Sequence, residues 1–357
     1  MTCDDRDGLV LTANAGSTGI KISIVDRDER SVRIGSFDDA PPGIVAIGHR
    51  IVFGGPFVAP VVIDDEVVRD LRAQGGVAPL HNAPALACID EARAAFAGVP
   101  QVAVFDTAFH AGIPDEASVY AVPAAWREHH DVRRHGFHGL SVEWAVGRAT
   151  ALLAPSRGAG RLVVCHLGGG ASATAVRGGR SIDTSMGFSP LEGLVMATRS
   201  GSIDPDIPLH LVLQAGIPPE EVQRMLNHES GLAALAGTAD MREVEATAAT
   251  GDGRATLALA VHDHRLAGTV AAMAGSLGGL DAVAFTGGVG EGSARVRAEI
   301  ARRLAFLGME VDPARNEAPG GDADVSTDAA GVRTLVVHSR EDVVIARAAR
   351  AAVGSPR

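Results

Sequence analysis

Residues 9–17 read LVLTANAGS, and residues 21–24 then alternate between polar and apolar side chains. An apolar run that ends at a polar turn and continues with a period of two predicts a strand, a turn and a second strand. Residues 162–170 read LVVCHLGGG, and the same arrangement follows, with a third strand expected near Ser181. One unit repeated about 150 residues later predicts an internal duplication, with two related α/β domains facing one another.

The rest of the chain alternates short apolar runs with helical patterns, as α/β proteins do. Further strands are predicted over residues 101–105, 282–286 and 332–337. A third glycine turn is predicted at residues 287–290 and a polar loop over residues 318–328. Helices are predicted over residues 64–73, 85–97, 218–226, 255–277, 293–304 and 342–352.

The composition is that of a globular protein long enough for two domains. The chain has 357 residues, 43 acidic and 32 basic, with a net charge of −11. No basic patch stands out, so nucleic-acid binding is disfavoured. The three cysteines lack CxxC spacing, which argues against a disulfide framework and a structural zinc site. Neither a signal segment nor a membrane-spanning apolar run is visible, so we expect a cytoplasmic protein that does not bind membranes.

Three glycine-containing turns follow apolar strands, at residues 14–19, 168–170 and 287–290. Glycines there let several backbone N–H groups converge on one anion, an arrangement suited to phosphates. Each turn alone is more often a plain tight turn, and none fits the phosphate-loop pattern GxxxxGKS/T. Three such turns at strand ends, in two domain-like units, shift the balance toward a nucleotide site.

Five polar residues in unusual surroundings are candidates for chemistry. Arg50 and Arg199 lie among apolar residues and glycines. A half-buried guanidinium needs an anionic partner, which is either a structural carboxylate or a bound carboxylate or phosphate. Asp106 directly follows a predicted strand and fits a Mg²⁺ ligand or a helix N-cap about equally well. For His138 and for His166, which precedes the second glycine turn, a structural role is the more usual one.

Seven ordered segments resemble the acetate kinase family almost from end to end. One such segment would be weak evidence, but seven in order are very specific together. They are residues 14–21, 78–82, 105–110, 135–139, 183–194, 198–205 and 285–291.

The resemblance implies the fold of the sugar kinase, actin and heat-shock chaperone superfamily. This fold is α/β, with two duplicated ribonuclease-H-like domains that have mixed sheets and an interdomain cleft. The expected N-terminal domain spans residues 1–110 and takes the C-terminal helix from residues 343–357. The expected nucleotide-binding domain spans residues 111–342.

The resemblance also implies site residues. The catalytic residues would be Arg50, Asp106, His138 and Arg199. Mg²⁺, which Mn²⁺ can replace, would be bound by Asp106, Glu341 and Asn14. The acid would be bound by Arg50 and by an apolar pocket made of Val52, Leu80, Phe137 and Pro190. The nucleotide would be bound by Asn14, Ser17, Lys21, His166, Gly168, Gly169, Gly170, Asp240, Arg242, Gly287, Gly288, Val289 and Gly290.

The implied function is that of a short-chain carboxylate kinase, which reversibly converts ATP and acetate to ADP and acetyl phosphate. A carboxylate is already ionised at pH 7, so catalysis needs positioning and charge neutralisation but no general base. We expect Arg50→Ala and Arg199→Ala to keep the fold and lose most of kcat. The resemblance also suggests a homodimer. The alternatives are a propionate or butyrate kinase and a non-catalytic, nucleotide-driven conformational protein of the same superfamily.

Several positions depart from the family pattern, and the segment between residues 26 and 48 is shorter than is typical. We expect these departures to affect phosphate geometry, the preferred phosphoryl donor and the shape of the acid pocket. The substituted positions are Gly19, Phe53, Ala83, Val142, Gly169, Gly292 and Arg340.

Overall fold

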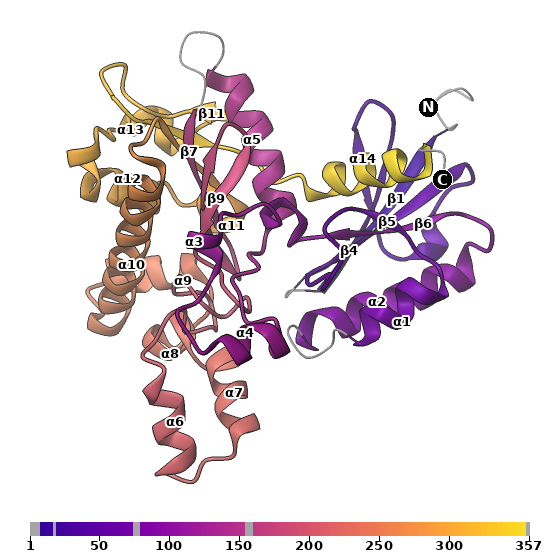
Figure 1. Cartoon of the computed structure of the whole chain (residues 1–357). Coiled ribbons are helices and arrows are strands. Elements are labelled where there is room, and N and C mark those ends of the chain that lie inside the picture. Colours follow the sequence, from indigo (N-terminus) through magenta and orange to yellow (C-terminus); the bar gives the residue numbers. More distant parts are fainter. Residues whose placement is uncertain (1–7, 17–18, 74–78, 154–159, 355–357) are drawn as a thin grey trace. The chain divides into compact units, whose positions relative to one another are not determined.

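The computed structural model describes residues 8–16, 19–73, 79–153 and 160–354, and the chain divides into two compact units (Figure 1). The first unit comprises Met1–Ala111, Phe137–Trp144 and Arg340–Arg357. The second comprises Gly112–Gly136 and Ala145–Ser339. The segment Phe137–Trp144, which the predicted boundaries assign to the second domain, therefore packs with the first unit. The boundaries of the functional domains stay a prediction.

The first unit is built on a six-stranded mixed sheet. Its strands are β1 (Leu9–Gly16), β2 (Gly19–Val25), β3 (Ser31–Ile34), β4 (Ile44–Ile51), β5 (Val61–Val62) and β6 (Gln101–Phe105). Their order in space is β3-β2-β1-β4-β6-β5. β2 is antiparallel to both β1 and β3, β4 is parallel to β1 and β6, and β5 is antiparallel to β6.

The second unit repeats this sheet strand for strand. Its strands are β7 (Arg161–Leu167), β8 (Ala171–Arg177), β9 (Arg180–Thr184), β10 (Ala282–Thr286), β11 (Ala323–Asp324) and β12 (Arg333–Val336). They lie in the order β9-β8-β7-β10-β12-β11, with the same parallel and antiparallel pairs as in the first sheet. The predicted α/β fold with two duplicated mixed-sheet domains is therefore confirmed.

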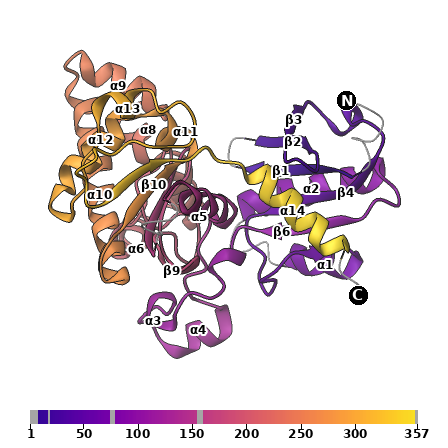
Figure 2. The same cartoon turned by 90° about the horizontal axis from the view of Figure 1, so that it is seen from above.

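Successive residues of β1 are buried on opposite faces of the first sheet. Val10 shares a core cluster with Ile345 of α14 (Glu341–Gly354), whereas Leu11 shares one with Cys88 of α2 (Pro79–Ala95). Because strand side chains alternate between faces, a strand covered on both sides needs an unbroken apolar run. Figure 2 shows α14, drawn in yellow, beside the strands of this sheet, although it is formed by the end of the chain.

Most of the predicted helices are confirmed, with ends shifted by a few residues. α10 begins after Asp252, whose side chain accepts from the Ala255 N–H at 2.7 Å, and ends at Gly278, which has a φ of +68°. This helix spans Gly253–Leu277. The other α-helices not yet named are α1 (Asp65–Ala73), α3 (Asp115–Ser118), α4 (Ala124–His130), α5 (Gly139–Leu153), α6 (Asp206–Leu213), α7 (Pro219–His228), α8 (Gly231–Ala236), α9 (Met241–Ala249), α11 (Gly287–Gly292), α12 (Ala294–Arg303) and α13 (Pro313–Glu317). Across the described ranges, no helix has both the length and the apolar character needed to cross a bilayer.

Two local predictions were wrong. Residues 287–290 form the first turn of α11 rather than a glycine turn. Glycine is a poor helix former, but hydrogen bonds from nearby side chains fix both ends of this short helix. Glu291 accepts from the Gly287 N–H at 2.9 Å, and Arg297 donates to the carbonyl of Gly290 at 2.9 Å. The polar loop predicted over residues 318–328 contains β11, whose two residues pair with β12.

Candidate active site

A buried ion pair lies at the carboxyl edge of the first sheet. Arg50 is near the end of β4, and Asp106 directly follows the neighbouring parallel strand β6. Nε and Nη2 of Arg50 donate to Oδ1 and Oδ2 of Asp106 at 3.0 and 2.5 Å. Both residues are buried. The carboxyl ends of parallel strands meet at one edge of a sheet, which is why two residues 56 positions apart come together.

Asn14 and Glu341 complete this group, which we call the Arg50 cluster. Nη1 of Arg50 donates to Oδ1 of Asn14 at 3.0 Å and lies 3.6 Å from Oε2 of Glu341. Nδ2 of Asn14 donates to the same Glu341 oxygen at 2.7 Å. The members come from β1, β4, the end of β6 and the first turn of α14, so distant segments supply one cation, two carboxyl groups and one amide.

Burial and pairing pull the pKa values of the Arg50 cluster in opposite directions. Burial alone would lower the pKa of Arg50, but the Asp106 and Glu341 carboxylates outweigh it and raise the pKa. Burial raises the pKa of Asp106, whereas Arg50 and the backbone N–H of His138 stabilise its ionised form. Arg50 therefore keeps its charge, and that charge is held in a fixed position.

The oxygen donors of this cluster suit a divalent cation. Asn14, Asp106 and Glu341 direct side-chain oxygens toward one positive group, the Arg50 guanidinium. Mg²⁺ is usually held by one or two carboxylates together with substrate phosphates and water. Among the residues that the structure describes, no group of three or more His, Cys, Asp or Glu side chains is arranged to hold a metal ion. A metal here would therefore rely on two carboxylates, the amide oxygen and ligands brought by the substrate.

His138 joins the first unit at the same place. The Gly139 N–H donates to the Asp106 carbonyl at 2.9 Å, and an added Cβ at Gly139 would overlap that oxygen. Only glycine therefore lets this segment approach the end of β6 so closely. The preceding His138 is buried and has a φ of +60°, an uncommon conformation for a residue with a side chain. The segment is thus held in a strained conformation against Asp106.

The other candidates of the first unit lie nearby or outside the described residues. Val52 follows β4 and is buried, as is Phe137, whose carbonyl bonds Nε2 of His110 at 3.0 Å. Leu80 belongs to α2, but its side chain is outside the described part of the structure. Ser17 is also outside the described residues. Lys21 is exposed on β2, opposite Asn14 in the strand pairing.

In the second unit, the glycines between β7 and β8 form a tight turn. The Gly168 N–H donates to the Gly170 carbonyl at 2.9 Å, and the Gly169 carbonyl accepts from the Ala197 N–H at 3.3 Å. One backbone donor of the predicted phosphate nest is therefore used within the turn itself. His166 lies two residues earlier on β7 and is half-buried.

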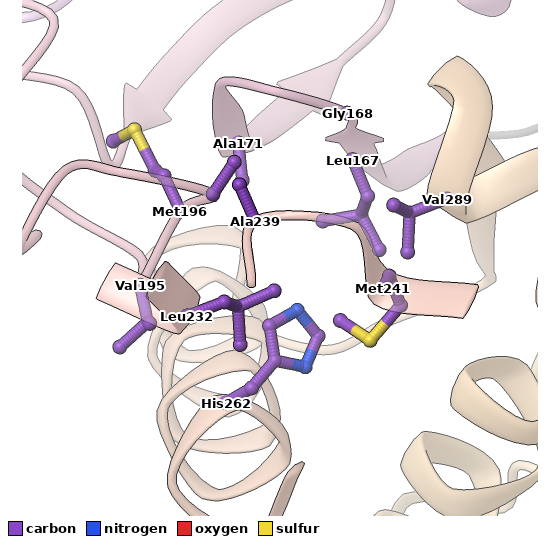
Figure 3. A pocket seen from close by; sticks show the side chains of 11 residues that line it. Leu167, Gly168, Ala171, Val195, Met196, Leu232, Ala239, Met241, His262 and Val289 are labelled. Atoms are coloured by element: carbon purple, nitrogen blue, oxygen red, sulfur yellow. The ribbon is translucent and has the colours of Figure 1, made fainter. Parts of the chain in front are cut away.

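A small cavity adjoins this turn (Figure 3). Its wall includes Gly168 of the turn, Val289 of α11, and Ala239 and Met241, which flank Asp240. It therefore borders three of the segments predicted to bind the nucleotide. The lining is mostly apolar, and the imidazole of His262 lies among these side chains, as in ligand pockets where a few polar groups orient the ligand.

Asp240 and Arg242 form the N-terminal cap of α9. Oδ1 of Asp240 accepts from the Arg242 N–H at 2.9 Å, and Nη2 of Arg242 lies 2.6 Å from Oδ2. These hydrogen bonds lower the pKa of Asp240 to about 2. The Arg242 side chain is largely exposed. The two predicted nucleotide residues are thus paired with each other at the helix end.

Arg199 is buried in the second unit. Its Nη1 donates to the carbonyl oxygen of Pro190 at 2.6 Å. Two predicted residues, one catalytic and one from the acid pocket, are therefore in direct contact. The other acid-pocket residues that the structure describes, Val52 and Phe137, belong to the first unit. That the two groups face each other across a cleft stays a prediction.

Some polar groups near these residues were not found from the sequence. Arg297 is buried and bonds Asn316 and the end of α11. Its position among the buried Val296 and Ile300 of α12 was a usable signal, since a charge on an apolar helix face needs a partner. Tyr120 and Glu192 hydrogen-bond each other across 72 positions, and no local pattern indicates such a contact.

The comparisons with known proteins decide the family. Residues 36–347 match the Acetokinase family. The chain belongs to the Acetokinase family. An acetate kinase of Deinococcus radiodurans is 46% identical over 364 residues, covering 97% of this chain and 92% of that protein. An acetate kinase of Leifsonia xyli is 48% identical over 312 residues, covering 87% of this chain and 79% of that protein.

Solved structures of acetokinases agree with this assignment. A propionate kinase from Francisella tularensis is 34% identical, with a TM-score of 0.89, covering 96% of this chain and 99% of that one. The acetate kinase of Porphyromonas gingivalis is 30% identical, with a TM-score of 0.84, covering 97% of this chain and all of that one. The resemblance inferred from seven sequence segments is therefore confirmed.

Proposed function

We propose that this acetokinase transfers the γ-phosphoryl group of ATP directly and reversibly to the carboxylate of acetate, giving ADP and acetyl phosphate. The observation that carries the proposal is the buried Arg50 cluster at a sheet edge, in a chain about half identical to proteins named acetate kinase. Two anions must approach each other in this reaction, and a fixed guanidinium lowers the repulsion between them.

The acid needs little activation. Its carboxylate is ionised at neutral pH, so the residues have only to orient it in line with the phosphorus atom and neutralise charge. Arg50, His138 and Arg199 are the groups we assign to this task. Asp106 and Asn14 keep the Arg50 fork in one orientation. Val52, Leu80, Phe137 and Pro190 would enclose the methyl end of the acid.

Mg²⁺ is the metal whose ligand preferences this oxygen-rich cluster meets, and Mn²⁺ can replace it. Asp106, Glu341 and Asn14 are the residues that would hold it. When bound, the ion would neutralise charge on the phosphate oxygens. The protein's own contribution is to keep the three oxygen donors together, which the hydrogen bond from Asn14 to Glu341 does.

The cavity in the second unit supports a site for the nucleoside part of ATP. Its lining is mostly apolar, with His262 as the polar side chain, which is typical of pockets that bind small molecules. Asp240 and Arg242 flank it, and Gly168–Gly170 and Gly287–Gly290 would lie beside the phosphates together with Asn14, Ser17, Lys21 and His166.

A hydroxamate assay for acyl phosphate tests the proposal. With ATP and Mg²⁺, product should form only when acetate is present. A chain that binds ATP but forms no acyl phosphate would instead be a nucleotide-driven conformational protein. A kcat/KM series over formate, acetate, propionate and butyrate identifies the acid. One methylene changes the binding free energy in an apolar pocket by only about 1–3 kcal/mol. The kcat/KM for acetate should therefore exceed that for propionate by roughly 10–200-fold at most.

We further propose that the protein works in the cytoplasm as a homodimer. The support is α6, none of whose residues is buried in the chain. Ile207, Leu209 and Leu213 of this helix are exposed, together with Ile203 just before it. Apolar side chains gathered on one segment are typical of a protein–protein contact.

A further inference from the structure

We propose that Glu192 is a positioning residue for Arg199, and that Tyr120 and Arg134 hold it in place. The inference rests on the proposed function, in which Arg199 acts on the reacting groups. All four residues belong to the second unit, so the argument depends on that unit alone. Glu192 lies in the segment 184–193, between β9 and the residues that lead to Arg199.

Both carboxylate oxygens of Glu192 are bound. The Tyr120 hydroxyl donates to Oε2, and Nη2 of Arg134 donates to Oε1 at 3.0 Å. The Arg134 guanidinium also lies over the Tyr120 ring, 5.4 Å from its centroid. Each member of this triad therefore contacts the other two, which restricts the carboxylate to one orientation.

The triad also binds the backbone of the segment that carries Glu192. Nη1 of Arg134 donates to the carbonyls of Thr184 and Ser185 at 3.1 and 3.2 Å. The Phe188 N–H donates to the Tyr120 oxygen at 3.0 Å. The start, the middle and the end of the segment are thus tied to the same two side chains.

Close packing leaves this segment little freedom. An added Cβ at Gly187 would overlap both the Glu192 carboxylate and the Tyr120 hydroxyl. The His135 N–H donates to the Gly187 carbonyl at 3.0 Å, next to Arg134 in the chain. A segment that is fixed by its neighbours at every second or third residue can hold a carbonyl in a defined place.

That carbonyl belongs to Pro190, two residues before Glu192. It accepts from Nη1 of Arg199 at 2.6 Å. The Arg199 backbone is tied to the same region, because its carbonyl accepts from the Met196 N–H at 3.2 Å. The structure therefore contains a continuous path from Tyr120 and Arg134, through Glu192 and Pro190, to the Arg199 guanidinium. Glu192 acts through Pro190, so it is a positioning residue and not a catalytic one.

Tyr120 supplies a spectroscopic signal for this arrangement. It is the single tyrosine of the chain, so tyrosinate absorbance reports on it alone. Burial and the hydrogen bond to Glu192 raise the pKa of Tyr120 well above its ordinary value, so its hydroxyl stays a donor. Loss of the Glu192 charge should lower the pH at which tyrosinate forms.

A double-mutant cycle tests the path. Glu192→Gln should lower kcat by about 10–100-fold, the scale expected for a misplaced catalytic group, with a much smaller change in KM for ATP. In the Arg199→Ala background the same substitution should change kcat by less than about twofold. An equal loss in both backgrounds would show that Glu192 acts independently of Arg199 and overturn the proposal.

Two further variants make the result unambiguous. Tyr120→Phe keeps the ring and removes the hydroxyl, which bonds Glu192 and the Phe188 N–H. It leaves the contact between Arg134 and Glu192 in place, so this variant should fold and show a smaller loss with the same dependence on Arg199. Glu299→Gln is the matched control, since Glu299 also accepts from two arginines, Arg302 and Arg303, but lies on α12. It should leave kcat unchanged.

A crystal structure of Glu192→Gln separates this inference from the proposed function. Displacement of the Arg199 guanidinium from the Pro190 carbonyl supports the positioning role whatever reaction the protein catalyses. An unchanged Nη1–O contact near 2.6 Å overturns it. The proposed function fails separately, if the unmodified protein forms no acyl phosphate from ATP and acetate.

Discussion

Arg50 and Asp106 form a two-pronged ion pair, with Nε–Oδ1 and Nη2–Oδ2 distances of 3.0 and 2.5 Å and side chains that are 10% and 0% exposed. This is the geometry by which a guanidinium recognises a planar carboxylate. The carboxylate of Asp106 thus fixes the plane of the guanidinium before any ligand arrives. The remaining nitrogen, Nη1, lies between Asn14 and Glu341.

Because the Arg50–Asp106 pair is buried, we expect Arg50→Ala to lower the stability of the protein as well as its activity. Arg50→Ala leaves Asp106 buried without its partner, so the free energy of unfolding should fall by about 3–5 kcal/mol. Denaturant unfolding measures the change. Arg72→Ala is the control, because Arg72 and Asp90 are both about half exposed and their pair should contribute no more than about 1 kcal/mol. Equal effects of the two substitutions would contradict the prediction.

Arg199→Ala should keep the fold and lose kcat by about 10³-fold or more, the scale of catalytic arginines in phosphoryl transfer. The reason is that its guanidinium is buried and anchored to a backbone carbonyl, so the substitution removes a positive charge that is held in a fixed position. The hydroxamate assay measures the loss. Arg254 donates to the Leu235 carbonyl from an exposed position, so Arg254→Ala is the matched control and should be fully active. Near-normal turnover of the Arg199 variant would rule out its proposed role.

The Arg50 cluster predicts that turnover depends on Mg²⁺ and that the Glu341 carboxylate sets the Mg²⁺ concentration required. Chelation with EDTA should abolish turnover, and Mg²⁺ should restore it. Glu341→Gln should raise the Mg²⁺ concentration needed for half-maximal rate by about 10–100-fold. Asp342 is the next residue of α14, and it pairs with Arg340 at 3.1 Å instead, so Asp342→Asn should leave the Mg²⁺ titration unchanged. Overlapping titrations for both variants would remove Glu341 from the metal site.

The sequence was sufficient for the fold because the fold depends on local patterns. The apolar runs at residues 9–13 and 162–165 and the glycines after them are enough to place β1 and β7, and the repeat predicts two similar sheets. Residues 287–290 were misjudged because Arg297 and Glu291 fix a helix that glycines alone would not form.

The candidate site was only partly predictable. Arg50 and Asp106 were each identified as candidates from the neighbouring residues in the sequence. Their pairing with each other was not predicted, because the sequence does not show that β4 and β6 are neighbours in the sheet. The contact between Tyr120 and Glu192 could not be predicted either, because the two residues are 72 positions apart in the sequence. The local sequence identifies residues in need of partners, and the order of the strands decides which partners they receive.

The exposed apolar helix α6 predicts the oligomeric state. Leu209→Asp places a charge among Ile207, Leu213 and Ile203, so it should convert a dimer to a monomer at the same protein concentration. Light scattering after size-exclusion chromatography gives the mass. Leu257→Asp on α10 is the control, because Leu257 is exposed to a similar degree but outside this group, and it should leave the mass unchanged. A monomeric unmodified protein would refute the homodimer directly.

The buried His49 predicts a loss of stability in acid. Its Nε2 bonds the Gln101 side chain at 2.9 Å, whereas its buried Nδ1 has no hydrogen-bond partner within the described residues. Burial lowers the pKa of His49 from 6.5 to about 4. The unfolded chain therefore binds this proton first, and the stability contributed by neutral His49 is complete above about pH 6.5 and lost as the pH falls toward 4.

The lowered pKa of His49 corresponds to a loss of about 3 kcal/mol of unfolding free energy in acid. Denaturant unfolding between pH 7 and pH 4 should show a shallower decline for His49→Asn than for the unmodified protein. The decline should persist in part, because burial also lowers the pKa of His110 to about 4. His264 is exposed on α10, so His264→Asn should leave the pH profile unchanged. A His49→Asn profile parallel to that of the unmodified protein would show that His49 does not control the acid sensitivity.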